Sequence, residues 1–223
     1  MFEHSRKVSA FLWDVDGTIV DSKNFAYDAT NDVLRKLGKQ TYTNEEYLEL
    51  FSKDWEIHVK RMGIESAQEV NLLINTWNSR LVSDKHKFQL YDGILDILTY
   101  LHKRNFKMAI VSSSSRSQLQ LYFDLFKINR FFSAVIAKED ADDQKTMTSP
   151  ILKACEQLHV SPPNCIFIDD TEDGIEAAKN VDAVSIGVTW GFNSSRRITA
   201  AKPDFLADSP DDLSRIIMEL AKS

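Results

Sequence analysis

Two aspartates, separated by a single residue, directly follow the first apolar segment of the chain. Residues 8–15 form a nearly continuous apolar run, which is typical of a strand buried on both faces, and the run ends in DVDGT at 14–18. Along an extended strand, Asp14 and Asp16 lie on the same side, so both carboxylates can reach one phosphorus atom. Gly17 lets the backbone turn tightly and present N–H groups to an anion. The motif therefore predicts chemistry on a phosphate group.

Further polar side chains follow later apolar segments, or precede a helix expected near the same edge. The carboxyl ends of parallel strands meet at one edge of a sheet, and ligands bind there. We therefore expect these side chains to gather beside Asp14 and Asp16. They are Ser112, Lys145, Asp169 and Asp170.

Four carboxylates crowded at one edge predict a metal ion. The carboxylates repel one another, and a bound divalent cation removes that conflict. Oxygen ligands without cysteine or histidine favour Mg²⁺. A cation beside a free carboxylate, a lysine and a hydroxyl suits phosphoryl transfer, because the cation and the lysine neutralise the phosphoryl oxygens while a carboxylate attacks in line.

The apolar periodicity divides the chain into two kinds of region. The pattern is helical throughout 22–88, whereas from residue 89 helices alternate with short apolar strands. This order predicts a doubly wound parallel α/β sheet, built from 1–21 and 89–223, with an all-helical insertion at 22–88. Strands are expected at 107–111, 131–137, 165–168, 184–188 and 204–206. Helices are expected at 24–38, 45–51, 55–62, 67–82, 94–101, 119–126, 151–158, 174–180 and 213–220.

Taken in order, the motifs resemble those of the haloacid dehalogenase-like (HAD) phosphatases. The run at 14–18 matches the DxDGT signature, and Val111-Ser112 is similar to the second motif, an apolar strand ending in Ser or Thr. Lys145 resembles the lysine of the third motif, and FIDD at 167–170 with GIEAA at 174–178 resembles the fourth. The resemblance covers nearly the whole chain. It is nearest to the phosphoglycolate phosphatase and β-phosphoglucomutase-like branch, which implies a Rossmann-like core with a small helical cap.

The resemblance implies the roles of the acidic residues. Asp14 is the nucleophile that forms an aspartyl-phosphate. Asp16 protonates the leaving oxygen and then activates water, an acid–base contribution typically worth about 10²–10⁴-fold in rate. Mg²⁺ is bound by Asp14, the backbone carbonyl of Asp16 and Asp170, with Asp169 nearby or coordinating.

The resemblance also assigns residues to the phosphate group. Ser112 and Lys145 hold the phosphoryl oxygens, and Thr18 supports the phosphate-binding loop. The family often follows its lysine with a proline-rich KPxP stretch, whereas here TMTSP follows Lys145. Lys138 is therefore the alternative lysine. Ser113 is the alternative to Ser112, and the position directly after the apolar run favours Ser112.

Other interpretations of the acidic residues fit the spacing less well. In a calcium loop the glycine is the sixth residue of DxDxDG, whereas Gly17 is the fourth residue of its motif. The two-component receiver fold also joins acids, a hydroxyl and a lysine around Mg²⁺, but it is shorter and its acidic pair precedes the lysine. A dehalogenase is disfavoured, because resemblance to that branch would require a residue other than aspartate at position 16.

Residues outside these motifs have two interpretations each. Trp190 and Phe192 follow the strand at 184–188 and either flank the site or pack in the core. Four residues of the helical insertion either contact the substrate or form a solvated helix face with one buried aromatic residue. The residues concerned are Trp55, His58, Lys60 and Arg61.

Composition excludes several classes of protein. The 223 residues are 43% hydrophobic, which supplies a core and excludes disorder as the main state. A net charge of −6 disfavours a nucleic-acid partner, and the absence of a long apolar run disfavours a membrane one. Cys155 and Cys165 lack metal-ligand spacing and are expected in the core as thiols, which predicts a reduced, cytoplasmic protein. Nothing in the sequence indicates an oligomeric state.

These observations predict a Mg²⁺-dependent phosphatase for a small phosphorylated metabolite. A small cap can close over a compact substrate and exclude bulk water. One alternative is a sugar phosphomutase that uses the same aspartyl-phosphate. A second alternative is a catalytically silent binding module on the same fold, which the intact set of acidic residues disfavours.

Overall fold

A parallel sheet in the order β5–β4–β1–β6–β7–β8 forms the centre of the computed structural model, which describes residues 7–141 and 148–222. The predicted doubly wound α/β fold is confirmed, and the strands predicted at 107–111 and 184–188 have those bounds. The strand predicted at 131–137 is shorter, because residues 129–131 form a 3-10 turn. The strands are β1 (Ala10–Trp13), β4 (Lys107–Val111), β5 (Ala134–Ile136), β6 (Cys165–Asp169), β7 (Val184–Val188) and β8 (Phe205–Ala207).

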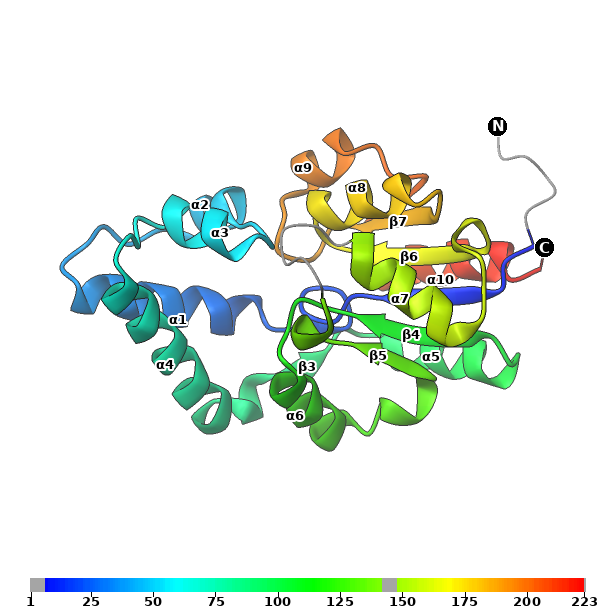
Figure 1. Cartoon of the computed structure of the whole chain (residues 1–223), viewed down its shortest axis with the longest axis horizontal. Coiled ribbons are helices and arrows are strands. Elements are labelled where there is room, and N and C mark those ends of the chain that lie inside the picture. Colours follow the sequence, from blue (N-terminus) through cyan, green and yellow to red (C-terminus); the bar gives the residue numbers. More distant parts are fainter. Residues whose placement is uncertain (1–6, 142–147, 223) are drawn as a thin grey trace.

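Successive residues of β1 face opposite sides of the sheet, and both sides are covered. Phe11 packs in a cluster with residues of α5 and α10, whereas Leu12 packs in a second cluster with α7 and α8. Both side chains are fully buried, as expected for a central parallel strand. Figure 1 shows α7 and α8 in front of the sheet. The helices of this part are α5 (Ile94–Lys103), α6 (Arg116–Phe126), α7 (Thr148–Leu158), α8 (Glu172–Asn180), α9 (Ser195–Ala200) and α10 (Pro210–Leu220).

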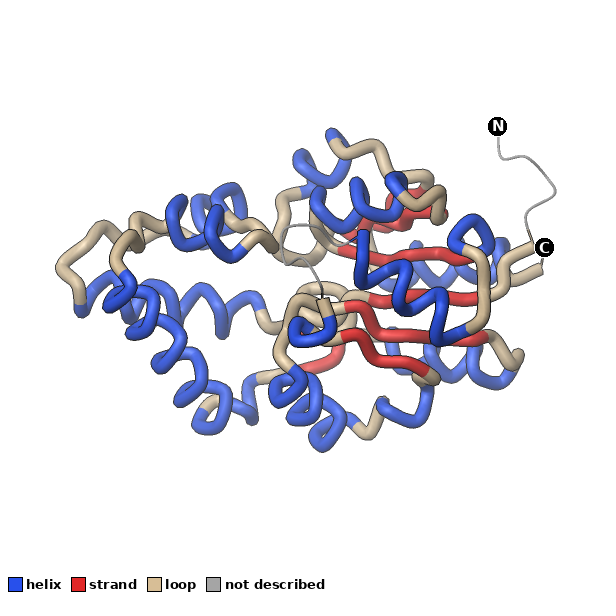
Figure 2. The backbone as a smooth tube through the Cα atoms, viewed as in Figure 1, coloured by secondary structure: helices blue, strands red, loops and turns tan. Residues whose placement is uncertain are grey.

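A helical insertion separates β1 from the later strands of the sheet. A short antiparallel pair, β2 (Val20–Asp21) with β3 (Gln89–Leu90), lies where the insertion leaves and rejoins the sheet. Strands of two residues have no periodicity, so this pair was not predicted. Figure 2 shows the insertion at the end of the molecule opposite the two chain termini. Its helices are α1 (Lys23–Lys36), α2 (Asn44–Leu50), α3 (Trp55–Arg61) and α4 (Ala67–Ser83), followed by the 3-10 turn η1 (Lys85–Lys87).

The two cysteines are buried in the core. Cys155 on α7 and Cys165 on β6 are free thiols whose sulfur atoms lie 3.4 Å apart. Within the described part of the chain, none of the helices combines the length and the apolar character that crossing a bilayer requires.

Phe11→Ala tests the packing of the central strand. The Phe11 ring is fully buried and lies edge to face with Phe106, with 5.2 Å between ring centroids. Its removal is expected to lower the free energy of unfolding by about 3–5 kcal/mol, because a cavity forms in a closely packed core. Urea denaturation measures this change. Leu206→Ala on β8, where the residue is 37% exposed, is the control and is expected to cost far less. Equal losses at both positions would contradict the packing described here.

Candidate active site

Three aspartates from two adjacent strands meet at the carboxyl edge of the sheet. Asp14 follows β1, Asp169 ends β6, and Asp170 follows it, while β1 and β6 pair in parallel. One carboxylate oxygen of each lies within 4.8 Å of the others, and all three residues are at most 1% exposed. No described residue donates a hydrogen bond to either carboxylate oxygen of Asp14. This acid cluster (Asp14, Asp169 and Asp170) therefore has the oxygen donors and the unsatisfied charge that suit a hard divalent cation.

A lysine from the helical insertion places its ammonium group against the acid cluster. Lys53 lies in the loop between α2 and α3, and its Nζ is 2.6 Å from Oδ2 of Asp169 and 3.2 Å from Oδ2 of Asp14. Burial lowers the pKa of Lys53, but the charges of Asp14, Asp169 and Asp170 together outweigh burial and hold that pKa above its usual range. Burial raises the pKa of Asp14 well above its usual range, and Lys53 opposes that rise. The insertion thus supplies one positive charge to a site rich in carboxylates.

Neighbouring donors fix the other two carboxylates of the acid cluster. The Thr18 hydroxyl donates to Oδ1 of Asp170 at 3.1 Å, and the Phe192 backbone N–H donates to Oδ2 at 2.6 Å. Oδ1 of Asp169 accepts from the backbone N–H and the hydroxyl of Thr171, at 2.8 and 2.7 Å. Burial, and then the Asp169 charge, raise the pKa of Asp170 to about 6. Thr18 is fully buried, and the hydrogen bond that its hydroxyl donates goes to the Asp170 carboxylate.

Two glycines let the backbone approach these carboxylates closely. Gly17 has a φ of +82°, which confirms the predicted tight turn, and a Cβ atom there would lie 2.3 Å from Oδ2 of Asp170. A Cβ atom at Gly174, in the first turn of α8, would lie 2.2 Å from Cγ of Asp169. Alanine at either position would push a carboxylate out of the acid cluster.

The carboxylate of Asp16 is held by residues of α6 and the loop before it. Oδ1 accepts from the hydroxyl of Tyr122 at 2.7 Å, and Nε2 of Gln118 lies 3.2 and 3.1 Å from the two oxygens. The Ser114 hydroxyl also donates to Oδ2. Burial, and then the charge of Asp16, raise the pKa of Tyr122 far above its usual range, so its hydroxyl stays protonated and donates. The Asp16 side chain stands beside the acid cluster without joining it.

A cavity of about 490 Å³ opens between the acid cluster and the helical insertion. Ser112 and Ser113 both line it, and Ser112 is 3% exposed. Lys145 lies outside the described residues. Lys138, the alternative lysine, lines the cavity, and its Nζ lies 5.7 Å from the centroid of the Trp55 ring.

The sequence model of the family described as haloacid dehalogenase-like hydrolase matches residues 11–188. The chain belongs to this family. A phosphoglycolate phosphatase from Synechococcus elongatus is 28% identical over 96% of this chain and 100% of its own length. A pyrophosphatase PpaX from Bacillus cereus is 25% identical over 97% of this chain and 100% of its own length. The crystal structure of a predicted phosphoglycolate phosphatase from Haemophilus somnus has a TM-score of 0.83 at 19% identity, covering 94% of this chain and 97% of the other.

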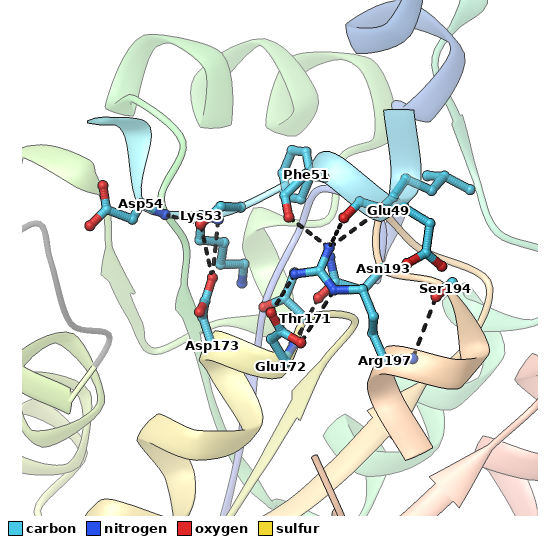
Figure 3. Close-up of polar contacts among 12 residues, drawn as sticks. Glu49, Phe51, Lys53, Asp54, Thr171, Glu172, Asp173, Asn193, Ser194 and Arg197 are labelled. Carbon is cyan, nitrogen blue, oxygen red and sulfur yellow. Dashed lines mark hydrogen bonds and ion pairs between the residues drawn. The ribbon is translucent and has the colours of Figure 1, made fainter. Parts of the chain in front are cut away.

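Arg197 joins the sheet side of this HAD hydrolase to the end of α2. From α9, its Nη1 donates to three backbone carbonyl oxygens at 2.8 to 3.2 Å, and its Nε donates to Glu172 at 3.2 Å (Figure 3). The last carbonyls of a helix have no partner within the helix, and a guanidinium satisfies them well. The three carbonyl oxygens belong to Leu48, Glu49 and Phe51.

Asp173 holds the next residues of the same loop. Its Oδ2 accepts from the backbone N–H of Lys53 at 3.2 Å and from the hydroxyl of Ser52 at 3.4 Å (Figure 3). Asp173 lies in the first turn of α8, directly after the strand that carries Asp169. Arg197 and Asp173 therefore set where the loop stands, and with it the Lys53 ammonium group.

Some of the residues around the cavity were predicted from the sequence and others were not. Trp55 and His58 line the cavity, whereas Lys60 and Arg61 are exposed and do not. Lys53 was missed, because a single lysine between two helical patterns carries no motif. The one signal for it is the interruption of the helical periodicity at residues 51–54.

Arg197→Met tests the contact between α9 and the end of α2. The substitution removes the donor for three carbonyl oxygens, so the free energy of unfolding is expected to fall by about 1–3 kcal/mol. Limited proteolysis should cleave residues 39–54 faster than in the unchanged protein. Arg196→Met is the matched control, because the Arg196 side chain is 81% exposed and forms an ion pair with the Glu49 side chain at the surface. Similar cleavage rates for the two variants would contradict this role.

Proposed function

We propose that this HAD hydrolase is a Mg²⁺-dependent phosphatase that acts on a small phosphomonoester through an aspartyl-phosphate at Asp14. The observation that carries the proposal is the acid cluster, which is buried at the carboxyl edge of the sheet and of which Asp14 lines the cavity. Buried carboxylates this close need a cation, and the all-oxygen donor set suits Mg²⁺. When bound, Mg²⁺ supplies charge neutralisation for the carboxylates and the phosphoryl oxygens.

In the proposed mechanism two carboxylates act in turn on the phosphate ester. Asp14 attacks the phosphorus atom, and Asp16 gives its proton to the leaving oxygen. Asp16 then takes a proton from the water that hydrolyses the aspartyl-phosphate. Three donors hold the Asp16 carboxylate in one orientation, which supports the second step, in which this group takes the proton from water. The nucleophile role of Asp14 is supported by its carboxylate oxygens, which accept no hydrogen bond from the described residues.

The remaining assignments divide the metal from the phosphate. We propose Asp14, Asp169, Asp170 and the backbone carbonyl of Asp16 for Mg²⁺, and Ser112 for a phosphoryl oxygen. A lysine completes the phosphate site. Lys145 keeps that role by its resemblance to the third motif, and the described alternatives that line the cavity are Lys53 and Lys138.

We propose that residues 22–88 form the cap and that residues 1–21 with 89–223 form the core. The β2–β3 pair supports these boundaries, because it lies where the helical insertion leaves the sheet. In this arrangement the cap covers the reaction and excludes bulk water. We also propose a cytoplasmic location, which the two free buried thiols support.

The names of the relatives agree on the type of reaction but differ in the substrate. One is named for phosphoglycolate and another for pyrophosphate, and both names describe phosphate release. Hydrolysis is therefore favoured over the transfer that a sugar phosphomutase performs. Incubation with β-glucose 1-phosphate separates the two reactions, because a phosphatase yields free phosphate and a mutase yields glucose 6-phosphate.

Asp14→Asn tests the covalent mechanism. The amide keeps the shape of the side chain but cannot attack phosphorus, so turnover is expected to fall by about 10³-fold or more. Phosphate release from a panel of metabolites with Mg²⁺ measures the loss, and a chelator should abolish release by the unchanged enzyme. Circular dichroism and the melting temperature control for folding. Near-normal turnover by the variant would rule out Asp14 as the nucleophile.

Lys53→Met tests the charge balance of the acid cluster. Without Mg²⁺ the variant leaves buried carboxylates unpaired, which typically costs about 3–5 kcal/mol, or roughly 6–20 °C in melting temperature. Mg²⁺ should restore much of this loss, so the difference between Mg²⁺ and chelator should exceed that of the unchanged protein. Thermal denaturation measures both values. Lys60→Met, at an exposed position of α3, is the control. An unchanged metal effect in Lys53→Met would contradict the role of this lysine.

A further inference from the structure

The cavity differs sharply between its two sides. Serines and carboxylates line the side that belongs to the sheet and its loops. The helical insertion contributes most of the aromatic lining, with Phe25 from α1, Trp55 from α3, and Ile74 and Trp77 from α4. It also contributes the polar side chains of Ser22, Ser52, Lys53 and Asn78. The Trp77 ring centroid lies 6.0 Å from those of Phe25 and Trp55. A leaving group beside Trp77 therefore has aromatic rings within reach for stacking.

Two buried polar side chains on this aromatic side lack hydrogen-bond partners among the described residues. They are Nε1 of Trp77 and both ring nitrogens of His58, which is 2% exposed and lines the cavity. Burial lowers the pKa of His58 to about 4, so the imidazole is neutral at pH 7 and offers one donor and one acceptor. Leaving such groups buried and unpaired is costly. Both residues line the cavity, where an indole and a neutral imidazole offer flat rings rather than charge to a ligand.

Charge and size both disfavour a small acidic leaving group. The described residues that line the cavity include three carboxylates and two lysines, with no arginine, and Lys53 is already paired with the acid cluster. A second carboxylate or phosphate on the substrate would therefore find little positive charge. The cavity volume of about 490 Å³ lies within the range of roughly 300–1,000 Å³ typical of sites for drug-sized ligands. That is far more space than a phosphate with a glycolate needs.

We propose, on the basis of the phosphatase function above, that the substrate is a phosphomonoester whose alcohol carries a flat, uncharged heteroaromatic ring. Nucleoside 5′-monophosphates are the class that we infer, with the phosphate at Asp14 and the base among Phe25, Trp55 and Trp77. The P–O ester bond breaks as the Asp14–phosphorus bond forms, and Asp16 gives its proton to the ribose oxygen. Water then splits the aspartyl-phosphate, so the products are the nucleoside and inorganic phosphate.

The test compares substrates on the full-length enzyme with Mg²⁺. Phosphate release is measured for the common nucleoside 5′-monophosphates, phosphoglycolate, pyrophosphate and acetyl phosphate. Pyridoxal 5′-phosphate is included because it carries the same kind of ring from another source. At least one nucleoside monophosphate is expected to exceed phosphoglycolate and pyrophosphate by about tenfold or more in kcat/KM, the size of effect that stacking on an aromatic side chain gives. Preference for pyridoxal 5′-phosphate would support a substrate with a heteroaromatic ring but contradict the assignment to nucleoside monophosphates.

Variants of Trp77 connect this preference to the cavity. Trp77→Leu is expected to lower kcat/KM for the preferred ring substrate about tenfold and to leave acetyl phosphate within about twofold. Trp77→Phe keeps a ring and should retain most of the activity. Ile57→Ala, at an exposed position of α3 outside the cavity, is the control. An equal loss on acetyl phosphate would contradict a role in specificity, and the melting temperatures show whether the variants fold.

Two outcomes separate this inference from the proposed function. If phosphoglycolate or pyrophosphate is the best substrate, the phosphatase function stands and the aromatic substrate class is wrong. If no compound releases phosphate, the function fails, and binding then decides the substrate class. Tryptophan fluorescence of Asp14→Asn with Mg²⁺ is expected to show saturable quenching by nucleoside monophosphates. Absence of quenching by all of them would overturn the inference.

Discussion

Burial of three carboxylates at one edge of the sheet is the constraint on which the rest of the site depends. Removing a charged group from water is costly, and three like charges within reach of one another add repulsion to that cost. The structure meets the cost in two ways. Backbone and hydroxyl donors stabilise Asp169 and Asp170, whereas Asp14 receives no hydrogen bond from the described residues. The charge of Asp14 must therefore be balanced by a cation. Both a bound metal ion and the Lys53 ammonium group can supply that positive charge.

The same constraint couples the helical insertion to the sheet. Lys53 brings its charge to the acid cluster only when the loop after α2 lies against α8 and α9, where Asp173 and Arg197 hold it. The electrostatic energy of the site thus favours the arrangement in which the insertion covers the cavity. A bound divalent cation would take over the charge balance and leave the ammonium group free to meet the oxygens of a substrate. Lys53 therefore links the position of the insertion to the charge balance of the acid cluster.

The sequence predicted the sheet well because its strands are regular. Continuous apolar runs indicated β1 and β6, and the rule that parallel strands end at one edge predicted that Asp14 lies next to Asp170. The contacts that periodicity did not reveal join single residues distant in the chain. Arg197 contacts Phe51 at the end of α2, and the two residues are 146 positions apart in the sequence. No local pattern encodes such a contact. The pair β2–β3 was missed for the opposite reason, since strands of two residues are too short to have a period.

The proposed reaction and the proposed substrate preference rest on different parts of this fold. The carboxylates proposed for attack and for the metal end or follow strands, so their positions are tied to the register of the sheet. The rings around Trp77 belong to helices α1, α3 and α4 of the insertion rather than to the sheet. Exchanging Trp77 for a cationic residue would alter the leaving group that is accepted without moving Asp14. Identity of about 25–28% to phosphatases with small acidic substrates therefore constrains the reaction more strongly than it constrains the substrate.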